Sequence, residues 1–271
     1  MQIIRGLFLG AVISFLARRA GALSPSGAWA AAVTGGLIFG LGGLRWAVLL
    51  LVFFFTSSAL SRLFGRRKRA LEENFAKGSQ RDAAQVLANG GLAALLATLQ
   101  ALQPNLPFWW LAFAGSLAAV NADTWATELG VLSPHAPRLI TSGRLVARGA
   151  SGGISALGYL AAAAGSGLIA SLAAWLAPGS IQNLSPISLG ACVCLAGLAG
   201  TTLDSLLGAT LQAIYRCPAC QKETERHPTH ACGAHTIHVR GWRWMNNDMV
   251  NGLAALMGAV AAVLLGTFLR F

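Results

Sequence analysis

About eight apolar segments, separated by short polar loops, restrict the folds open to this sequence. They span residues 3–17, 26–43, 46–61, 84–103, 107–128, 154–177, 187–212 and 248–269. A helix needs roughly 20 mostly apolar residues to cross a bilayer, where each backbone amide must be satisfied inside the segment. The chain is 55% hydrophobic and only 11% charged, a composition that favours a membrane protein over a soluble domain. We predict an all-α fold: one integral membrane domain over residues 1–271, a polytopic transmembrane bundle of about eight helices, with seven to nine as the range.

The first apolar segment is short enough to resemble the core of a signal peptide. Arg18 and Arg19 follow it, where a signal peptidase would need small neutral residues. We therefore expect a helix there. The 32 glycines suit helices that pack closely in lipid.

Basic residues gather in the odd-numbered loops, at 18–19, 62–81, 138–148 and 216–243, whereas the even-numbered loops contribute only Arg45. The positive-inside rule places the odd loops in the cytoplasm and both termini on the opposite side. The net charge of +11 thus describes one face. Since nucleic-acid binding would need a soluble basic surface, we expect no nucleic-acid partner, and expect the run 66–69 to attract anionic lipid headgroups.

Four carboxylates stand apart from the other acidic residues. Glu72, Glu73, Asp82, Glu223 and Glu225 sit in or beside soluble loops. The remaining four lie within or at the cytoplasmic ends of apolar segments, where an ionised carboxylate is costly without a cation or polar partner. The catalytic candidates are therefore Asp123, Glu128, Asp204 and Asp248.

Residues 121–130 place their polar side chains on one side of a helix, within an arc of roughly 160°. Residues 200–212, around Asp204, form a faint echo of this pattern. Two acidic helices that meet would suit Mg²⁺, which takes carboxylate oxygens together with substrate phosphates. We expect Asp123, Glu128 and Asp204 to bind it. The alternative is a pair of buried polar networks that hold helices together.

Polar entries into three helices are candidates for phosphate binding. They are the small-residue turn within 139–155, the stretch from residue 77 into the fourth apolar segment, and the start of the last one. No GxxxxGK[ST] or GxGxxG pattern occurs. Asn247 could instead serve only as a helix N-cap. The candidates for substrate or nucleotide phosphate are Lys77, Arg81, Asn89, Asn121, Thr124, Thr141, Arg144, Arg148, Ser151, Gly152, Gly153, Asn247 and Asn251.

The loop at 213–247 carries CPAC (217–220) and HACG (230–233). Three cysteines and a histidine suit tetrahedral zinc, and a reducing cytoplasm favours metal over disulfide. His227 or His235 could replace His230, and free thiols in a disordered loop are the alternative. We predict a closed structural zinc knuckle held by Cys217, Cys220, His230 and Cys232.

The blocks NADTWATELG (121–130), LITSGRLVARGASGGIS (139–155), GTTLDSLLGATLQ (200–212) and CPAC, HACG and WMNNDMVN (within 217–251) resemble the membrane family that contains phytyl-phosphate kinase. The resemblance covers nearly the whole chain and extends, more loosely, to CTP-dependent polyprenol kinases. It implies a bacterial inner or thylakoid-type membrane. It also implies conversion of phytyl monophosphate to the diphosphate with a nucleoside triphosphate, commonly CTP, for tocopherol synthesis. Residues 149–153 read Gly-Ala-Ser-Gly-Gly where the family has Gly-Thr-Asn-Gly-Gly.

These features together favour a Mg²⁺-dependent phosphotransferase acting on a prenyl (phytyl or geranylgeranyl-type) monophosphate at the cytoplasmic face. The prenyl tail would stay in lipid while Lys77, Arg81, Arg144 and Arg148 neutralise phosphates. A secondary transporter of an ionic or phosphorylated lipid solute is one alternative. A CTP-dependent prenol kinase or lipid nucleotidyltransferase at the same site is another. An oligomer is compatible with the sequence.

Overall fold

The computed structural model describes residues 2–68, 80–106, 108–181 and 184–269, and these fold into eight α-helices. Each helix coincides with one predicted apolar segment, so the predicted all-α bundle is confirmed. The basic side chains at 66–69 lie outside the described part. The helices are α1 (Gln2–Arg19), α2 (Pro25–Leu37), α3 (Leu44–Lys68), α4 (Ala83–Leu102), α5 (Phe108–Gly130), α6 (Ala156–Trp175), α7 (Pro186–Thr210) and α8 (Asn247–Phe268).

Short elements fill the connections. A π-helix, η1 (Ile38–Gly42), continues α2, and a 3₁₀ helix, η3 (Gly179–Ile181), follows α6. Strands β1 (Arg138–Leu139) and β2 (Gly153–Ile154) pair antiparallel between α5 and α6. Between α7 and α8, strands β3 (Ile214–Arg216), β4 (Glu223–Thr224) and β5 (Ile237–Arg240) form an antiparallel sheet in the order β4-β3-β5.

Polar residues fix where five of the helices begin. In each case a side-chain oxygen just before the helix accepts a hydrogen bond from the backbone amide three residues on, which satisfies an amide that the first turn leaves unpaired. Proline is the first residue of α2 and α7, where its missing amide hydrogen costs nothing. The capping residues are Ser24, Asp82, Ser155, Ser185 and Asn246.

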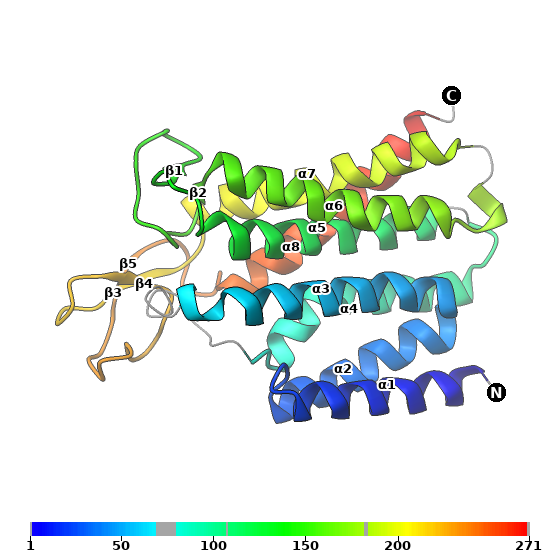
Figure 1. Cartoon of the computed structure of the whole chain (residues 1–271), viewed down its shortest axis with the longest axis horizontal. Coiled ribbons are helices and arrows are strands. Elements are labelled where there is room, and N and C mark those ends of the chain that lie inside the picture. Colours follow the sequence, from blue (N-terminus) through cyan, green and yellow to red (C-terminus); the bar gives the residue numbers. More distant parts are fainter. Residues whose placement is uncertain (1, 69–79, 107, 182–183, 270–271) are drawn as a thin grey trace.

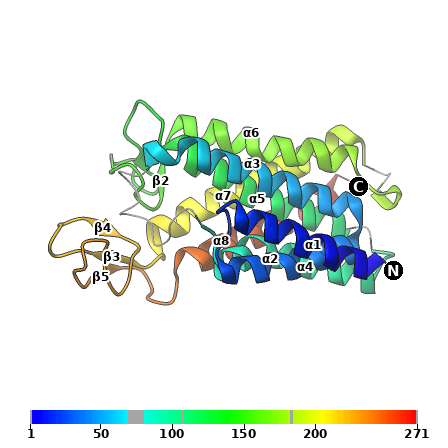
Figure 2. The ribbon, with the colours of Figure 1, turned by 60° about the horizontal axis from the view of Figure 1, so that its bottom comes forward.

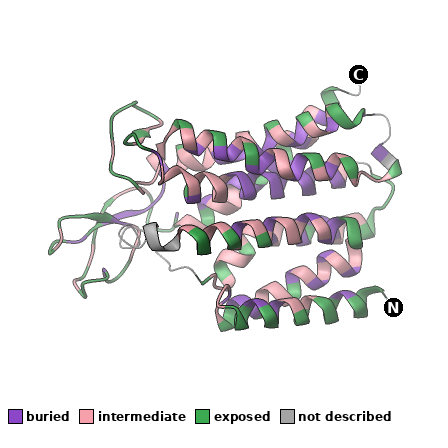
Figure 3. Cartoon of the chain, viewed as in Figure 1, coloured by how far each residue is buried: buried purple, intermediate pink, exposed green. Residues whose placement is uncertain are grey.

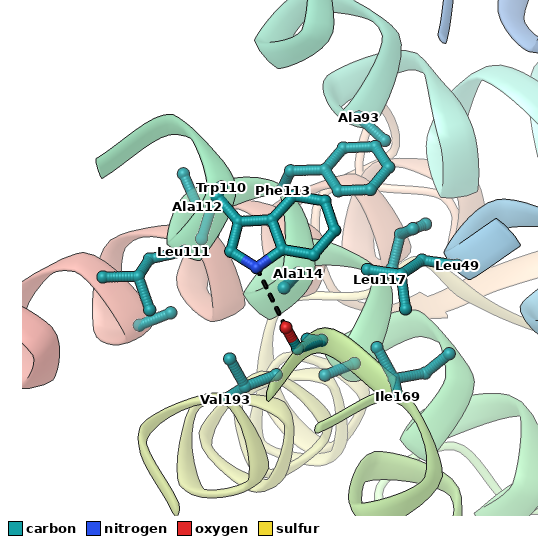
Figure 4. Close-up of a cluster of buried hydrophobic side chains, with 14 of the residues drawn as sticks. Leu49, Ala93, Trp110, Leu111, Ala112, Phe113, Ala114, Leu117, Ile169 and Val193 are labelled. Atoms are coloured by element: carbon teal, nitrogen blue, oxygen red, sulfur yellow. Dashed lines mark hydrogen bonds between the residues drawn. The ribbon is translucent and has the colours of Figure 1, made fainter. Parts of the chain in front are cut away.

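Helix α5 is the centre of the bundle, and α3, α4, α6, α7 and α8 pack around it (Figures 1 and 2). Nearly every side chain from Trp110 to Ala122 is buried, as the colouring in Figure 3 shows. Trp110 donates from Nε1 to the backbone oxygen of Ala173 at 3.1 Å, which satisfies the buried indole (Figure 4). Helices α1 and α2 pack on each other beside α4, at the edge of the bundle.

Five of the described helices are long and apolar enough to cross a membrane: Leu44–Phe64 of α3, and α4, α6, α7 and α8. The protein is thus an integral membrane protein with five candidate spans, fewer than the apolar segments suggested. Helix α2 has only 13 residues, while α1 carries arginines and α5 carries two carboxylates. Burial of α5 by its neighbours lets it keep these polar groups out of lipid.

The two strand-bearing connections lie together at one end of the bundle, and the marked N and C ends lie at the other (Figure 1). This arrangement agrees with the predicted segregation of the odd-numbered loops. Polar connections that are far apart in the sequence therefore lie together at one end of the bundle.

Candidate functional site

A polar cavity of about 670 Å³ lies at the end of the bundle where the strand-bearing connections meet. Its walls come from the C-terminal halves of α5 and α7, the starts of α4, α6 and α8, and both connections. The volume is within the range of about 300–1,000 Å³ of pockets that enclose a small ligand. We call it the polar cavity.

All four predicted carboxylates line the polar cavity: Asp123, Glu128, Asp204 and Asp248. They come from three helices that meet only in the folded chain. Thr201 of α7 donates from Oγ1 to Oδ1 of Asp123 at 3.3 Å, which links α5 to α7.

Asp204 is a carboxylate whose surroundings disfavour its negative charge. Its Oδ2 is buried and has no hydrogen-bond partner among the residues that the structure describes. The negative charges of Asp123 and Glu225 are close enough to repel its carboxylate. Like charges gathered in a poorly solvated place require a cation or a proton. This part of the polar cavity therefore suits a bound cation.

Glu225 also lines the polar cavity, although the sequence predicted only that it lies in or beside a soluble loop. It follows β4 directly, and its Oε1 accepts from Ser151 Oγ at 2.8 Å and from Gln212 Nε2 at 2.7 Å. These bonds hold the carboxylate in the wall of the polar cavity beside Asp204. The sheet between α7 and α8 directs Glu225 toward the polar cavity. No local pattern in the sequence predicts this orientation.

Four arginines line the polar cavity together with the carboxylates. Arg81 and Arg148 were predicted; Arg226 and Arg243 were not, and they also line it. Arg148 donates to the backbone oxygens of Ser133 at 2.9 Å and Pro134 at 3.1 Å, which orients its guanidinium. Lys77 lies outside the described residues.

Arg81 lies just before α4, next to the carboxylate that ends α5. Burial lowers the pKa of its guanidinium, and the negative charge of Glu128 opposes that shift. Glu128 is itself buried and accepts from Ser61 Oγ at 2.8 Å. The pair therefore places a cation and an anion at one side of the polar cavity.

The small-residue turn contributes residues 149–155 to the polar cavity. Gly152 has a φ of 81°, in the left-handed region that favours glycine, and a Cβ there would collide with Ala209 of α7. The glycine thus permits close packing of the turn on α7. Ser151, Gly152 and Gly153 all line the polar cavity.

Nine of the thirteen predicted phosphate-binding residues line the polar cavity: Arg81, Asn89, Thr124, Arg148, Ser151, Gly152, Gly153, Asn247 and Asn251. Of the other four, Lys77 lies outside the described residues, and the structure places the remaining three elsewhere.

Asn121, Thr141 and Arg144 do not line the polar cavity. Asn121 is buried between helices, where Nδ2 donates to the backbone oxygen of Gly165 at 2.7 Å. Thr141 and Arg144 are exposed in the connection between β1 and β2. Asn121 therefore joins α5 to α6, and its polar neighbours along the chain face the polar cavity instead.

The N-cap of α8 lies one residue earlier than Asn247, the cap that the sequence suggested. Asn246 is the N-cap, with its side chain accepting from the amide of Met249 at 3.0 Å. Asn247 is consequently the first helical residue, and it lines the polar cavity with Asp248 and Asn251. The N-cap and the residues of α8 that line the polar cavity are thus different side chains.

The predicted metal ligands meet in the connection between α7 and α8, residues 211–246, which we call the Cys/His loop. The four ligand atoms lie within 4.8 Å of one another. Sγ of Cys217 is 3.5 Å from Sγ of Cys232, and Nδ1 of His230 is 3.7 Å from Sγ of Cys220 and 3.2 Å from Sγ of Cys232. Tetrahedral zinc would place its ligands about 3.3–3.8 Å apart. The cluster could therefore hold a metal ion such as zinc.

His230, as predicted, completes this cluster. His227 instead stacks on Tyr215, with ring centroids 4.5 Å apart, and lines the polar cavity. His235 pairs with Thr229 through a backbone bridge. The pKa of the Cys217 thiol is lowered. Desolvation by burial alone would raise this pKa, but hydrogen bonds from the backbone amides of Cys220 and Ala219 and from the neighbouring thiols outweigh that effect.

Comparisons with known proteins agree with this picture. Residues 8–259 match the family model described as "Integral membrane protein DUF92". Protein PGR of Arabidopsis thaliana is 33% identical over 277 residues, covering 94% of this chain and 93% of PGR. The uncharacterized membrane protein MJ0933 of Methanocaldococcus jannaschii is 32% identical over 202 residues, covering 74% of this chain and 79% of that protein. The chloroplastic protein VTE6 of Arabidopsis thaliana is 25% identical over 251 residues, covering 91% of this chain and 66% of VTE6. No solved structure matches the chain.

Proposed function

This chain belongs to the DUF92 family of integral membrane proteins, and we propose that it is a lipid-phosphate kinase. It transfers a phosphoryl group from a nucleoside triphosphate, CTP by the family resemblance, to a prenyl monophosphate of the phytyl or geranylgeranyl type. The products are the prenyl diphosphate and the nucleoside diphosphate.

The observation that carries this proposal is the meeting of carboxylates and arginines in one cavity at one end of the bundle. Phosphoryl transfer is catalysed mainly by positioning and by neutralising charge on the transferring group. Arginines bind phosphate oxygens through paired N–H donors, and carboxylates hold a divalent cation against them. The polar cavity supplies both kinds of group.

Asp123 and Asp204 are the residues that we assign to Mg²⁺, with Glu225 beside them. The buried, unpaired Oδ2 of Asp204 and the like charges around it fit such a cation. Mg²⁺ would supply charge neutralisation at the phosphates of the nucleotide. Glu128, which was also predicted to bind the ion, lies beside Arg81 and accepts from Ser61, so we assign it to orient that arginine.

The remaining groups bind and orient phosphates. Arg81, Arg148, Arg226 and Arg243 provide positive charge, and the amides of the small-residue turn lie in the same wall. An oxygen of the prenyl monophosphate attacks the γ-phosphorus, and the bond from that phosphorus to the bridging oxygen of the β-phosphate breaks. Because the monophosphate is already an anion, the step needs no general base.

The proposed side of the membrane follows from charge. The polar cavity is lined by residues of the two basic, strand-bearing connections, which lie at one end of the bundle and which the positive-inside rule assigns to the cytoplasm. A site at one end of the bundle supports an enzyme over a carrier, whose binding site would lie near the middle of the bilayer.

The test uses the purified full chain in lipid nanodiscs with Mg²⁺, CTP and phytyl monophosphate. We expect phytyl diphosphate and CDP, identified by mass spectrometry, and no product from the Asp204→Asn variant. Release of pyrophosphate would instead identify a nucleotidyltransferase. Uptake of the lipid phosphate into sealed vesicles without nucleotide would identify a transporter and overturn the kinase proposal.

A further inference from the structure

A second cavity, of about 200 Å³, lies between α1, α2, η1, α3 and the start of α4. Its walls are almost wholly apolar and include Leu9, Ile13, Phe39, Leu50 and Phe54. A dry, apolar cavity binds hydrocarbon and does not retain water. We call it the apolar cavity.

Packing explains why the space exists. Helix α1 packs on α2, α2 packs on α4, and α3 packs on α5 and η1. The apolar cavity lies where α3 faces α1 and α2, and η1 packs on all three of these helices. The π-helix η1 sits in its wall, and π-helical turns often accompany functional sites because they widen a helix locally.

The two cavities share Arg81, Gln85 and Asn89 in their walls. The apolar cavity therefore begins where the polar cavity ends. Oε1 of Gln85 and Oδ1 of Asn89 are buried and have no hydrogen-bond partner among the described residues. These amides have capacity left to bind the polar end of a ligand.

The apolar cavity is elongated along the bundle. Its lining residues on α3 run from Leu44 to Phe54, a length of about 15 Å at 1.5 Å per residue. Leu44 and Leu9, at the end far from Arg81, are 68% and 39% exposed. The far end thus reaches the lipid-facing surface.

Arg81 is held at the junction by both backbone and side chain. Its amide donates to the backbone oxygen of Ala22 at 3.1 Å, and its own backbone oxygen accepts from Ser24 at 3.0 Å. Gly27 allows this approach, because a Cβ there would collide with that oxygen. The guanidinium lies over Phe53 and Phe54, 5.6 and 5.8 Å from the ring centroids.

We propose that the apolar cavity binds the head-proximal part of a single-chain isoprenoid or alkyl phosphate whose phosphate lies on Arg81 in the polar cavity. This inference rests on the proposed function and names the part of the protein that selects its lipid substrate. Its volume is below the roughly 300–1,000 Å³ of pockets that enclose a whole ligand, so the rest of a long chain leaves past Leu9 and Leu44 into lipid. A second acyl chain has no place in it.

The experiment measures binding without nucleotide, so that it does not depend on phosphoryl transfer. The probe is a hexadecyl phosphate that carries a diazirine on its chain, photolysed with the full chain in nanodiscs and located by peptide mass spectrometry. Gly35→Leu and Gly90→Leu fill the apolar cavity, since a Cβ at Gly35 meets nothing closer than 3.9 Å and one at Gly90 meets nothing within 4 Å. Gly167→Leu on α6 is the matched control, with equally open space and no place in either cavity.

We expect labelling of the peptides of α1, α3 and α4, competed by hexadecyl phosphate and not by dipalmitoyl phosphatidic acid. The filling variants should bind the probe roughly 15-fold more weakly, the loss expected when two methylenes of the probe, each worth about fourfold in affinity, are displaced. Gly167→Leu should bind like the unmodified chain. Equal binding by all variants, labelling confined to other helices, or competition by phosphatidic acid would overturn the inference.

Activity assays on the same samples separate this inference from the proposed function. If labelling follows the expected pattern but no nucleotide yields a diphosphate, the lipid site stands and the kinase proposal fails. If phytyl diphosphate forms and the filling variants turn over phytyl and butyl phosphate in the unmodified ratio, the kinase proposal stands and the apolar cavity does not select the chain.

Discussion

Gln212, two residues beyond α7, donates from Nε2 to Oε1 of Glu225 at 2.7 Å. This bond lies within the Cys/His loop and holds Glu225 close to the end of α7, the helix that carries Asp204. Ser151 donates to the same oxygen from the connection between α5 and α6. One carboxylate thereby joins the two strand-bearing connections in the wall of the polar cavity.

Glu225→Gln should lower kcat by about 100-fold, the loss typical of removing one electrostatic contact in a catalytic site. The amide keeps the shape of the side chain but removes the charge beside Asp204. Steady-state formation of diphosphate measures the effect. Glu223→Gln, an exposed carboxylate two residues earlier and outside the polar cavity, is the matched control and should leave kcat unchanged. Equal activity of both variants would remove Glu225 from the site.

Asp204→Asn should abolish turnover and raise the Tm of the metal-free protein by about 2–4 °C. The stability gain follows because the change removes a charge that Asp123 and Glu225 repel. Thermal unfolding with and without Mg²⁺ measures it, and Mg²⁺ should stabilise the unmodified chain more than the variant. A lower Tm for the variant would mean that Asp204 holds the helices together.

The purified protein should contain about one zinc ion per chain, and Cys220→Ser should contain almost none, because a structural zinc site uses all four ligands. Elemental analysis measures the metal content. Cys194→Ala, in α7 and outside the cluster, is the control and should retain zinc. Zinc in both variants at the level of the unmodified chain would contradict the assignment.

Zinc removal should also disturb the wall of the polar cavity, since this wall includes Tyr215, Glu225 and His227 of the Cys/His loop. We expect chelator treatment to lower kcat while the α-helical content stays constant, because the four Cys/His ligands lie between α7 and α8 and not within a helix. Activity and far-ultraviolet circular dichroism on one sample test this. Full activity after complete zinc loss would show that the loop keeps its shape without metal.

Trp110→Ala should destabilise the protein by about 3–5 kcal/mol, because it empties a buried aromatic site at the centre of the bundle. It also leaves the backbone oxygen of Ala173 without the indole donor. Trp175→Ala removes a side chain that is 79% exposed and should have little effect. Denaturation in mild detergent compares the two, and equal losses would contradict the central place of α5.

Some of the site could be predicted because its signals are local. Carboxylates in apolar segments are costly in lipid, so Asp123, Glu128, Asp204 and Asp248 stood out, and all four line the polar cavity. The Cys/His spacing predicted the metal cluster in the same way. Asn121 carried the same signal as its neighbours but bonds to α6, because a polar arc of roughly 160° is wide enough to face both the polar cavity and a neighbouring helix.

The sequence by itself determined the eight helices, the end of the bundle that holds the charge, and the ligand set of the Cys/His cluster, because each depends on short-range patterns of polarity and spacing. Only the tertiary structure decided that Glu225, Arg226 and Arg243 join the polar cavity and that Arg81 stands between two cavities. Those placements depend on how segments far apart in the chain pack against one another. Such packing is a property of the assembled bundle, and no single segment encodes it.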